Sequence, residues 1–198
     1  MSSIGAKNLT YEDYLSLPET KQRYEIIDGV MLMAPGPTPA HQWFMQRIFI
    51  NLINYVTERD SGVVLVAPVD LLVDREPLRT RQPDVLYLSA ERTGVKGLSD
   101  LMGIQVLESS SALVVEVLSP GNSRRDIEDK LADYRRIAVR ECWLVSPEAE
   151  TVEILRLSID AAVTTAIFGV DDTLSSEILD DFTLPIREIF GQVFAKGI

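Results

Sequence analysis

The sequence contains one cysteine, one histidine and no long apolar run. The lone cysteine, Cys142, excludes an internal disulfide and any zinc cluster built on cysteines. The longest apolar runs have the length of strands, so no segment is expected to span a bilayer. The first residues, MSSIGAKNLTYEDY, also lack the apolar core of a signal peptide. These absences lead to the expectation of a cytoplasmic protein with no membrane partner.

Positive charge is also scarce. The net charge of −11 argues against a nucleic-acid partner. The acidity is concentrated late in the chain, however, because residues 147–198 hold ten acidic and three basic side chains, a balance of −7. Residues 121–140 hold six basic and four acidic side chains, a balance of +2. A nucleic-acid partner is therefore not excluded, but its binding is expected to be weak and sensitive to salt.

Nothing in the sequence divides the chain. Internal repeats, low-complexity tracts and glycine- or serine-rich linkers are all missing, and 198 residues suit one domain with a sizeable core. We therefore expect a single domain over residues 1–198.

Apolar spacing predicts helices at residues 9–18, His41–Arg59 and Ser123–Ile137. RYEIIDGVMLMAP predicts a hairpin around an Asp-Gly turn. Residues 90–111 are expected to form a loop with one helical turn at 98–102. The remaining strands are expected at VVLVAPVDLLV, DVLYLS, ALVVEVLS, ECWLVS, TVEILRLS and AAVTTAIF. This order predicts an α/β (α+β) domain with one central mixed β-sheet flanked by helices.

A glutamate, Glu116, interrupts the apolar strand ALVVEVLS, although a carboxylate is costly to bury without a partner. The alternation of a strand places it on the same face as Val114 and Leu118. One candidate partner is Lys130, whose aliphatic stem can run along the core so that its ammonium group reaches the sheet. The other is a Mg²⁺ ion shared with Asp84, just before the strand VLYLS.

A pair of carboxylates on neighbouring strands, completed by backbone carbonyls and water, is the hard oxygen site that Mg²⁺ prefers. Such a site can hold a scissile phosphate and activate a water molecule, and a nearby lysine can stabilise the charge that develops. The residues themselves leave both partners of Glu116 open.

Pro83-Asp84 followed at a distance by Glu116 resembles the pattern of the PD-(D/E)XK nuclease superfamily. The closest resemblance is to the Uma2 family of restriction-endonuclease-like proteins, the former DUF820 group, over roughly residues 10–190. It rests on YEIIDGVMLMAPGPTPAHQ, RQPDVLYLS and LVVEVLSPGNSRRDIEDKLADYRRIAVRECWLVSPE. The resemblance implies a restriction-endonuclease-like fold and Mg²⁺-dependent hydrolysis of DNA phosphodiester bonds, with Mn²⁺ able to substitute.

The resemblance also implies the site residues. The superfamily usually has a lysine two residues after the second acid, where this chain has Leu118, and the Uma2 family takes its lysine from the following helix. The implied catalytic residues are Lys130, Glu116, Asp84, Glu25 and His41. The implied metal ligands are Asp84, Glu116 and, through its backbone carbonyl, Val117. Two departures, Ala138 for the family's usual glycine and Cys142 for a common aromatic residue, concern packing rather than chemistry.

Two other functions stay open. The acidic balance and the lack of a separate DNA-reading domain favour a catalytically inactive nuclease-fold module that binds or regulates. A metal-dependent hydrolase of smaller phosphoesters would use the same acidic pair. Asp84, Glu116 and Lys130 together favour the nuclease, because a site kept only for folding would tolerate apolar residues. By analogy with restriction-type enzymes, a homodimer is expected.

Overall fold

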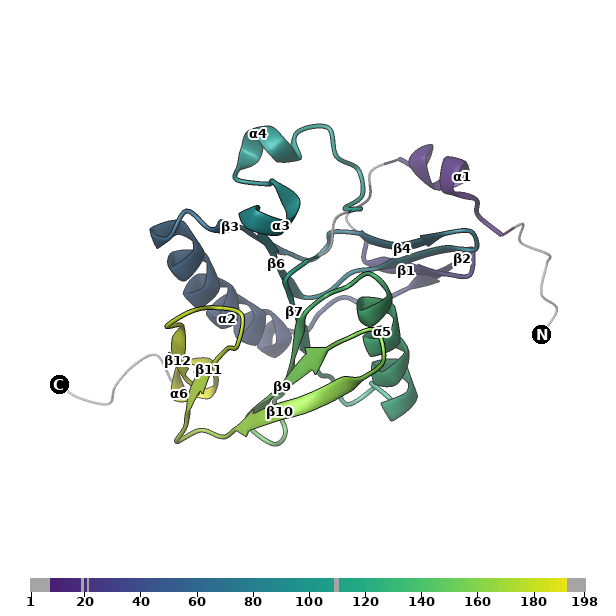
Figure 1. Ribbon diagram of the computed structural model, residues 1–198. Coiled ribbons are helices and arrows are strands. Elements are labelled where there is room, and N and C mark those ends of the chain that lie inside the picture. The colour runs from purple at the N-terminus through teal and green to yellow at the C-terminus, as the bar shows by residue number, and fades with distance from the viewer. Residues whose placement is uncertain (1–7, 19, 21, 109–110, 192–198) are drawn as a thin grey trace.

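The computed structural model describes residues 8–18, 20, 22–108 and 111–191. Its centre is a six-stranded sheet in the order β10-β9-β8-β7-β6-β3, in which only β7 and β8 run parallel (Figure 1). Its strands are β3 (Gly62–Val66), β6 (Val85–Ser89), β7 (Leu113–Val117), β8 (Glu141–Ser146), β9 (Thr151–Leu157) and β10 (Ala162–Phe168). The expected mixed central sheet is therefore confirmed.

A second, antiparallel sheet has the order β2-β1-β5-β4. It contains β1 (Tyr24–Ile27), β2 (Val30–Met33), β4 (Leu71–Arg75) and β5 (Leu78–Arg81). The single strand predicted for VVLVAPVDLLV is wrong, because the segment forms β3 and β4 in different sheets with Pro68 between them. A proline has no N–H to donate to a strand ladder, so the ladder ends there.

Helices cover both faces of the central sheet. The helix α2 (Pro39–Glu58) packs on one face and α5 (Arg124–Arg136) on the other (Figure 1). The short helices are α1 (Tyr11–Leu15), α3 (Ala90–Thr93), α4 (Leu98–Leu101) and α6 (Arg187–Phe190). The turn predicted at residues 98–102 is thus confirmed as α4. None of the helices in the described ranges is both long enough and apolar enough to cross a membrane.

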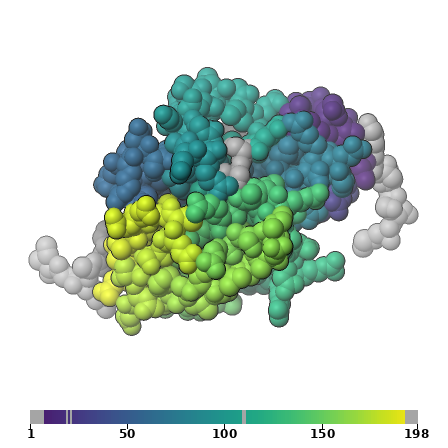
Figure 2. Space-filling view, in the orientation of Figure 1, coloured from purple at the N-terminus to yellow at the C-terminus, as the bar shows by residue number. Residues whose placement is uncertain are grey.

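The C-terminal part packs beside α2. It contains α6 and the two-stranded pair β11 (Thr173–Ser175) and β12 (Thr183–Pro185). Phe190 of α6 contacts Phe44 of α2, with ring centroids 5.4 Å apart. In Figure 2 this segment, in yellow, lies at the opposite end of the molecule from the N-terminal residues in purple. It therefore extends the core on the α2 side, away from α5.

Helix boundaries follow their capping residues. The helix α2 begins two residues earlier than predicted, because the Thr38 hydroxyl accepts a bond from the His41 N–H and Pro39 takes the first helical position. The helix α5 begins at a capping box, in which the Ser123 hydroxyl and the Asp126 carboxylate each accept a hydrogen bond from the other residue's backbone N–H. Its start fixes the position of Lys130 over the sheet.

The two faces of β7 differ in what they contact. Val115 and Val117 belong to the core beneath α2, while Val114 belongs to the core beneath α5. Glu116 lies on the α5 face with Val114, as the strand alternation predicts.

Ala138, in the turn between α5 and β8, adopts a φ of +57°, in the left-handed region that glycine tolerates best. We expect Ala138→Gly to raise the free energy of unfolding by about 1 kcal/mol, because the strain on Cβ outweighs the added chain entropy. Ala132→Gly in the middle of α5 is the control, and this substitution should lower the free energy of unfolding by about 0.5–1 kcal/mol. Urea unfolding measures both, and equal losses in the two variants would contradict this account.

Candidate active site

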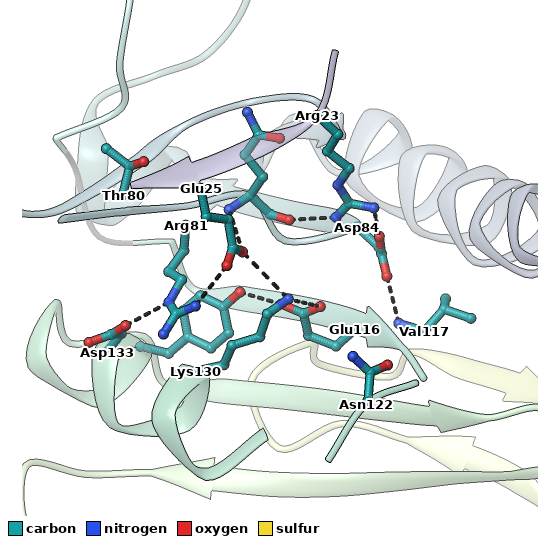
Figure 3. Close-up of polar contacts among 12 residues, drawn as sticks. Arg23, Glu25, Thr80, Arg81, Asp84, Glu116, Val117, Asn122, Lys130 and Asp133 are labelled. Carbon is teal, nitrogen blue, oxygen red and sulfur yellow. Dashed lines mark hydrogen bonds and ion pairs between the residues drawn. The ribbon is translucent and has the colours of Figure 1, made fainter. Parts of the chain in front are cut away.

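The five side chains predicted for catalysis come together between the second sheet, the central sheet and α5. Glu25 comes from β1, Asp84 immediately precedes β6, and Glu116 lies on β7 (Figure 3). Lys130 reaches them from α5, and His41 from the first turn of α2. Residues far apart in the sequence therefore form one charged cluster.

Glu116 is buried, with 6% of its surface exposed, and both of its carboxylate oxygens have partners. The Lys130 Nζ lies 2.8 Å from Oε2, and the Tyr134 hydroxyl donates a hydrogen bond to Oε1. Burial raises the pKa of Glu116 and nearby Asp84 raises it further, against the opposing effects of Lys130 and Tyr134. Lys130, one of the two candidate partners of Glu116, thus meets it in the structure.

Lys130 contacts a second carboxylate, with its Nζ 3.6 Å from Glu25 Oε1. Burial lowers the pKa of Lys130, but the charges of Glu116 and Glu25 outweigh it, and the net pKa is raised. The amine therefore stays protonated at neutral pH. It can supply positive charge but cannot act as a base.

Asp84 is 1% exposed and lies among donors and cations. The Val117 N–H donates to Oδ2 at 2.7 Å, and His41 Nε2 lies 3.2 Å from the same oxygen. The Arg23 Nη1 lies 2.6 Å from Oδ1. Burial raises the pKa of this carboxyl, but His41, Arg23 and the Val117 N–H outweigh burial, and the net pKa is lowered. Asp84 is therefore ionised at neutral pH.

A second layer of ion pairs, not predicted from the sequence, holds the site in place. The Arg81 guanidinium lies 2.7 Å from Glu25 and 2.6 Å from Asp133 of α5. Arg79 pairs with Asp133 at 2.7 Å. These contacts fix α5 against the second sheet, and so fix Lys130 against Glu25 and Glu116.

The donor set fits a hard divalent cation in its chemistry. Among the described residues, the buried Asp84 Oδ1 is met only by the Arg23 guanidinium, and each Glu116 oxygen accepts only one of the two bonds it can take. Among the described residues, no three His, Cys, Asp or Glu side chains are arranged as a metal centre. One or two carboxylates with water and substrate phosphate are nevertheless the usual ligands of protein-bound Mg²⁺.

The structure places Val117 beside this donor set. Its N–H is committed to Asp84 Oδ2, and its role as a carbonyl ligand stays a prediction. A cavity of about 20 Å³ lined by Glu116, Lys130 and Tyr134 adjoins the site. This volume is enough for one water molecule.

Comparisons with known proteins identify the family and the fold of the chain. The family model of Uma2, described as "Putative restriction endonuclease", matches residues 11–187. The chain belongs to the Uma2 family. The fold is similar to the crystal structure of a "putative nuclease belonging to DUF820" from Anabaena variabilis, with a TM-score of 0.73 and 18% identity over 92% of this chain and 97% of that one. No curated protein matches the chain.

Family membership confirms the resemblance drawn from the three sequence segments and the restriction-endonuclease-like fold. The Uma2 match spans all five acidic, basic and imidazole side chains of the site. The match by itself assigns no role to any one of them.

Glu25 gives the site a predictable response to acid. Burial raises its pKa, but Lys130, Arg81 and a backbone N–H outweigh burial and hold the pKa below the ordinary value. A carboxyl group whose pKa is lower in the folded state stabilises the folded protein at pH values above its unfolded pKa of about 4.3. This stabilisation is lost as the pH falls through the pKa of the folded state. We expect the stability difference between wild type and Glu25→Gln to shrink below about pH 4.3. Urea unfolding across this range measures it, and a constant difference would contradict it.

Proposed function

We propose that this Uma2 protein is a Mg²⁺-dependent endonuclease that hydrolyses DNA phosphodiester bonds, with Mn²⁺ able to substitute. The observation that carries the proposal is the buried Lys130–Glu116 ion pair beside the ionised Asp84. Uma2 membership supports it. A cytoplasmic location, one domain and a homodimer stay predictions; sedimentation equilibrium would test the last.

Asp84 and Glu116 are the residues that would hold the cation, and the backbone carbonyl of Val117 is the candidate third ligand. When bound, the cation supplies Lewis-acid polarisation of the phosphate and a more acidic water. Lys130 contributes a fixed positive charge near the negative charge that develops on the phosphate oxygens. His41 and the Val117 N–H orient Asp84 through its Oδ2.

Glu25 has a positioning role in this proposal. It shares Lys130 with Glu116 and is itself held by Arg81 and by the Gln82 N–H at 3.3 Å. It therefore limits the positions that the Lys130 ammonium can take.

The two alternative functions differ in their substrates. A binding or regulatory module would cut nothing, and a small phosphoester hydrolase would cut a nitrophenyl phosphodiester but not DNA. The net charge of −11 is the observation that still favours a module.

The test incubates the full chain with supercoiled plasmid, single-stranded DNA and bis-nitrophenyl phosphate, each with Mg²⁺, Mn²⁺ or EDTA. We expect the wild type to cleave DNA in a metal-dependent manner and the Glu116→Gln variant to cleave no DNA. Equal cleavage by wild type and variant would assign the activity to a contaminant, and absence of cleavage on every substrate would contradict the proposal.

A further inference from the structure

The site contains a cation that the sequence analysis did not assign, Arg23 on the chain segment just before β1. Its Nη1 lies 2.6 Å from Asp84 Oδ1, and its Nη2 donates a hydrogen bond of 2.6 Å to the Gln82 carbonyl. The side chain is 19% exposed, so it is partly accessible to solvent. Figure 3 shows it on the far side of Asp84 from Val117.

Arg23 is the partner of one particular oxygen of Asp84. Among the described residues, its guanidinium is the group that meets Oδ1, at 2.6 Å. Oδ2, by contrast, already faces the Val117 N–H and His41. Oδ1 is therefore the oxygen that becomes available to a cation when Arg23 moves away.

Arg23 is also less tightly held than the other cations of the cluster. Arg81 is bound by two carboxylates and is 7% exposed, and Lys130 likewise contacts two carboxylates. Arg23 contacts one carboxylate and one carbonyl. It is the one of these three cations that faces a single carboxylate, so it can leave with the smallest loss of ion pairs.

The charge balance of the site gives a reason for Arg23 to leave Asp84 when a metal ion binds. The inner carboxylates and the cations that face them are equal in number. They are Glu25, Asp84, Glu116 and Asp133 against Arg23, Arg79, Arg81 and Lys130. A divalent ion on Asp84 adds two positive charges and repels a guanidinium a few ångströms away. A planar guanidinium binds phosphate through two parallel hydrogen bonds, so a nucleic-acid backbone is its natural new partner.

We propose that Arg23 exchanges partners: it neutralises Asp84 in the metal-free site, yields Oδ1 to the incoming divalent cation and then binds a phosphate of the nucleic-acid strand. This inference rests on the proposed function. It assigns Arg23 as a phosphate-binding residue that competes with the metal, and it makes metal and nucleic-acid binding mutually supportive.

The exchange predicts opposite effects of one substitution. Arg23→Gln should bind Mn²⁺ about tenfold more tightly, since no guanidinium competes for Asp84, and this lies within the usual range of coupling between sites. In Ca²⁺, the same variant should bind a labelled duplex oligonucleotide about tenfold more weakly, because one phosphate contact is lost. Isothermal titration calorimetry measures the first and fluorescence anisotropy the second.

Arg47→Gln is the matched control. Arg47 on α2 also bonds a carbonyl, that of Glu188 at 2.7 Å, and pairs with a carboxylate, and its side chain is 23% exposed. It lies outside the site, so both affinities should stay at the wild-type value. Arg23→Lys keeps the charge and should keep the wild-type Mn²⁺ affinity.

The outcomes separate the two proposals. Unchanged or weaker Mn²⁺ binding by Arg23→Gln, with normal binding by the wild type, would overturn the exchange alone. Tighter Mn²⁺ binding with unchanged oligonucleotide binding would overturn the phosphate contact. A wild-type protein that binds neither Mn²⁺ nor the oligonucleotide would overturn the proposed function as well.

Discussion

Lys130→Met should lower the rate of DNA cleavage by about 10²–10³-fold, the usual loss when one positioned charge is removed from a transition state. Lys130 is 2.8 Å from Glu116, and its raised pKa keeps it cationic. Folding should be largely retained, because Glu116 keeps its hydrogen bond from Tyr134 and its raised pKa lets it take up a proton when no metal is bound. Metal binding should also be largely retained, because both proposed ligands, Asp84 and Glu116, are still present. Single-turnover cleavage of plasmid DNA measures the loss.

Lys96→Met is the control for this substitution, because Lys96 is exposed and lies in the loop between α3 and α4. It should cleave at the wild-type rate. A Lys130→Met protein that also cleaves at the wild-type rate would show that Lys130 serves only to neutralise Glu116.

A double variant tests whether the lysine must come from α5 or only has to place its charge near Glu116. Leu118 occupies the place of the superfamily's usual lysine and packs in the core beneath α5. Adding Leu118→Lys to Lys130→Met should restore part of the activity, with recovery limited by the strain of a larger polar side chain there. No recovery, in a double variant that folds, would mean that the charge must come from α5.

The second large effect concerns metal binding. A ligand that binds only the folded state stabilises it by about 2.7 kcal/mol at a hundredfold excess over its dissociation constant. We expect Mg²⁺ or Mn²⁺ to stabilise the wild type in this way, and Asp84→Asn and Glu116→Gln to abolish the effect. Thermal unfolding with and without metal measures it.

Asp74→Asn is the matched control, because Asp74 on β4 is an acid paired with Arg136 outside the site. It should keep the full metal response. The same response in Asp84→Asn would show that the cation binds elsewhere.

The sequence was most informative where local patterns decide the structure. The apolar alternation around Glu116 predicted its face, and the helical spacing after Ser123 predicted that Lys130 reaches the sheet; both are confirmed. The Ser123–Asp126 cap explains this, since it fixes where α5 begins. Asp84 could be identified as a site residue only with the family resemblance, because alone it resembles an ordinary residue before a strand.

Long-range ion pairs could not be predicted. The strand LRTR of β5 has no apolar alternation, and Arg81 is buried only because Asp133, 52 residues away, and Glu25 neutralise it. Arg23 likewise resembles a solvated arginine until β1 brings it beside Asp84. Its sequence signal was its position two residues before Glu25, because side chains two residues apart in an extended segment point to the same side.

Anomalous diffraction from a crystal soaked in Mn²⁺ tests most directly whether the buried carboxylates of β6 and β7 hold the cation on which the proposed chemistry depends. The account predicts a peak roughly 2 Å from an oxygen of Asp84 and from an oxygen of Glu116. It also predicts that the Arg23 guanidinium no longer contacts Asp84 Oδ1. A fully soaked crystal with no peak between these two carboxylates, or with its strongest peak elsewhere, would contradict the account.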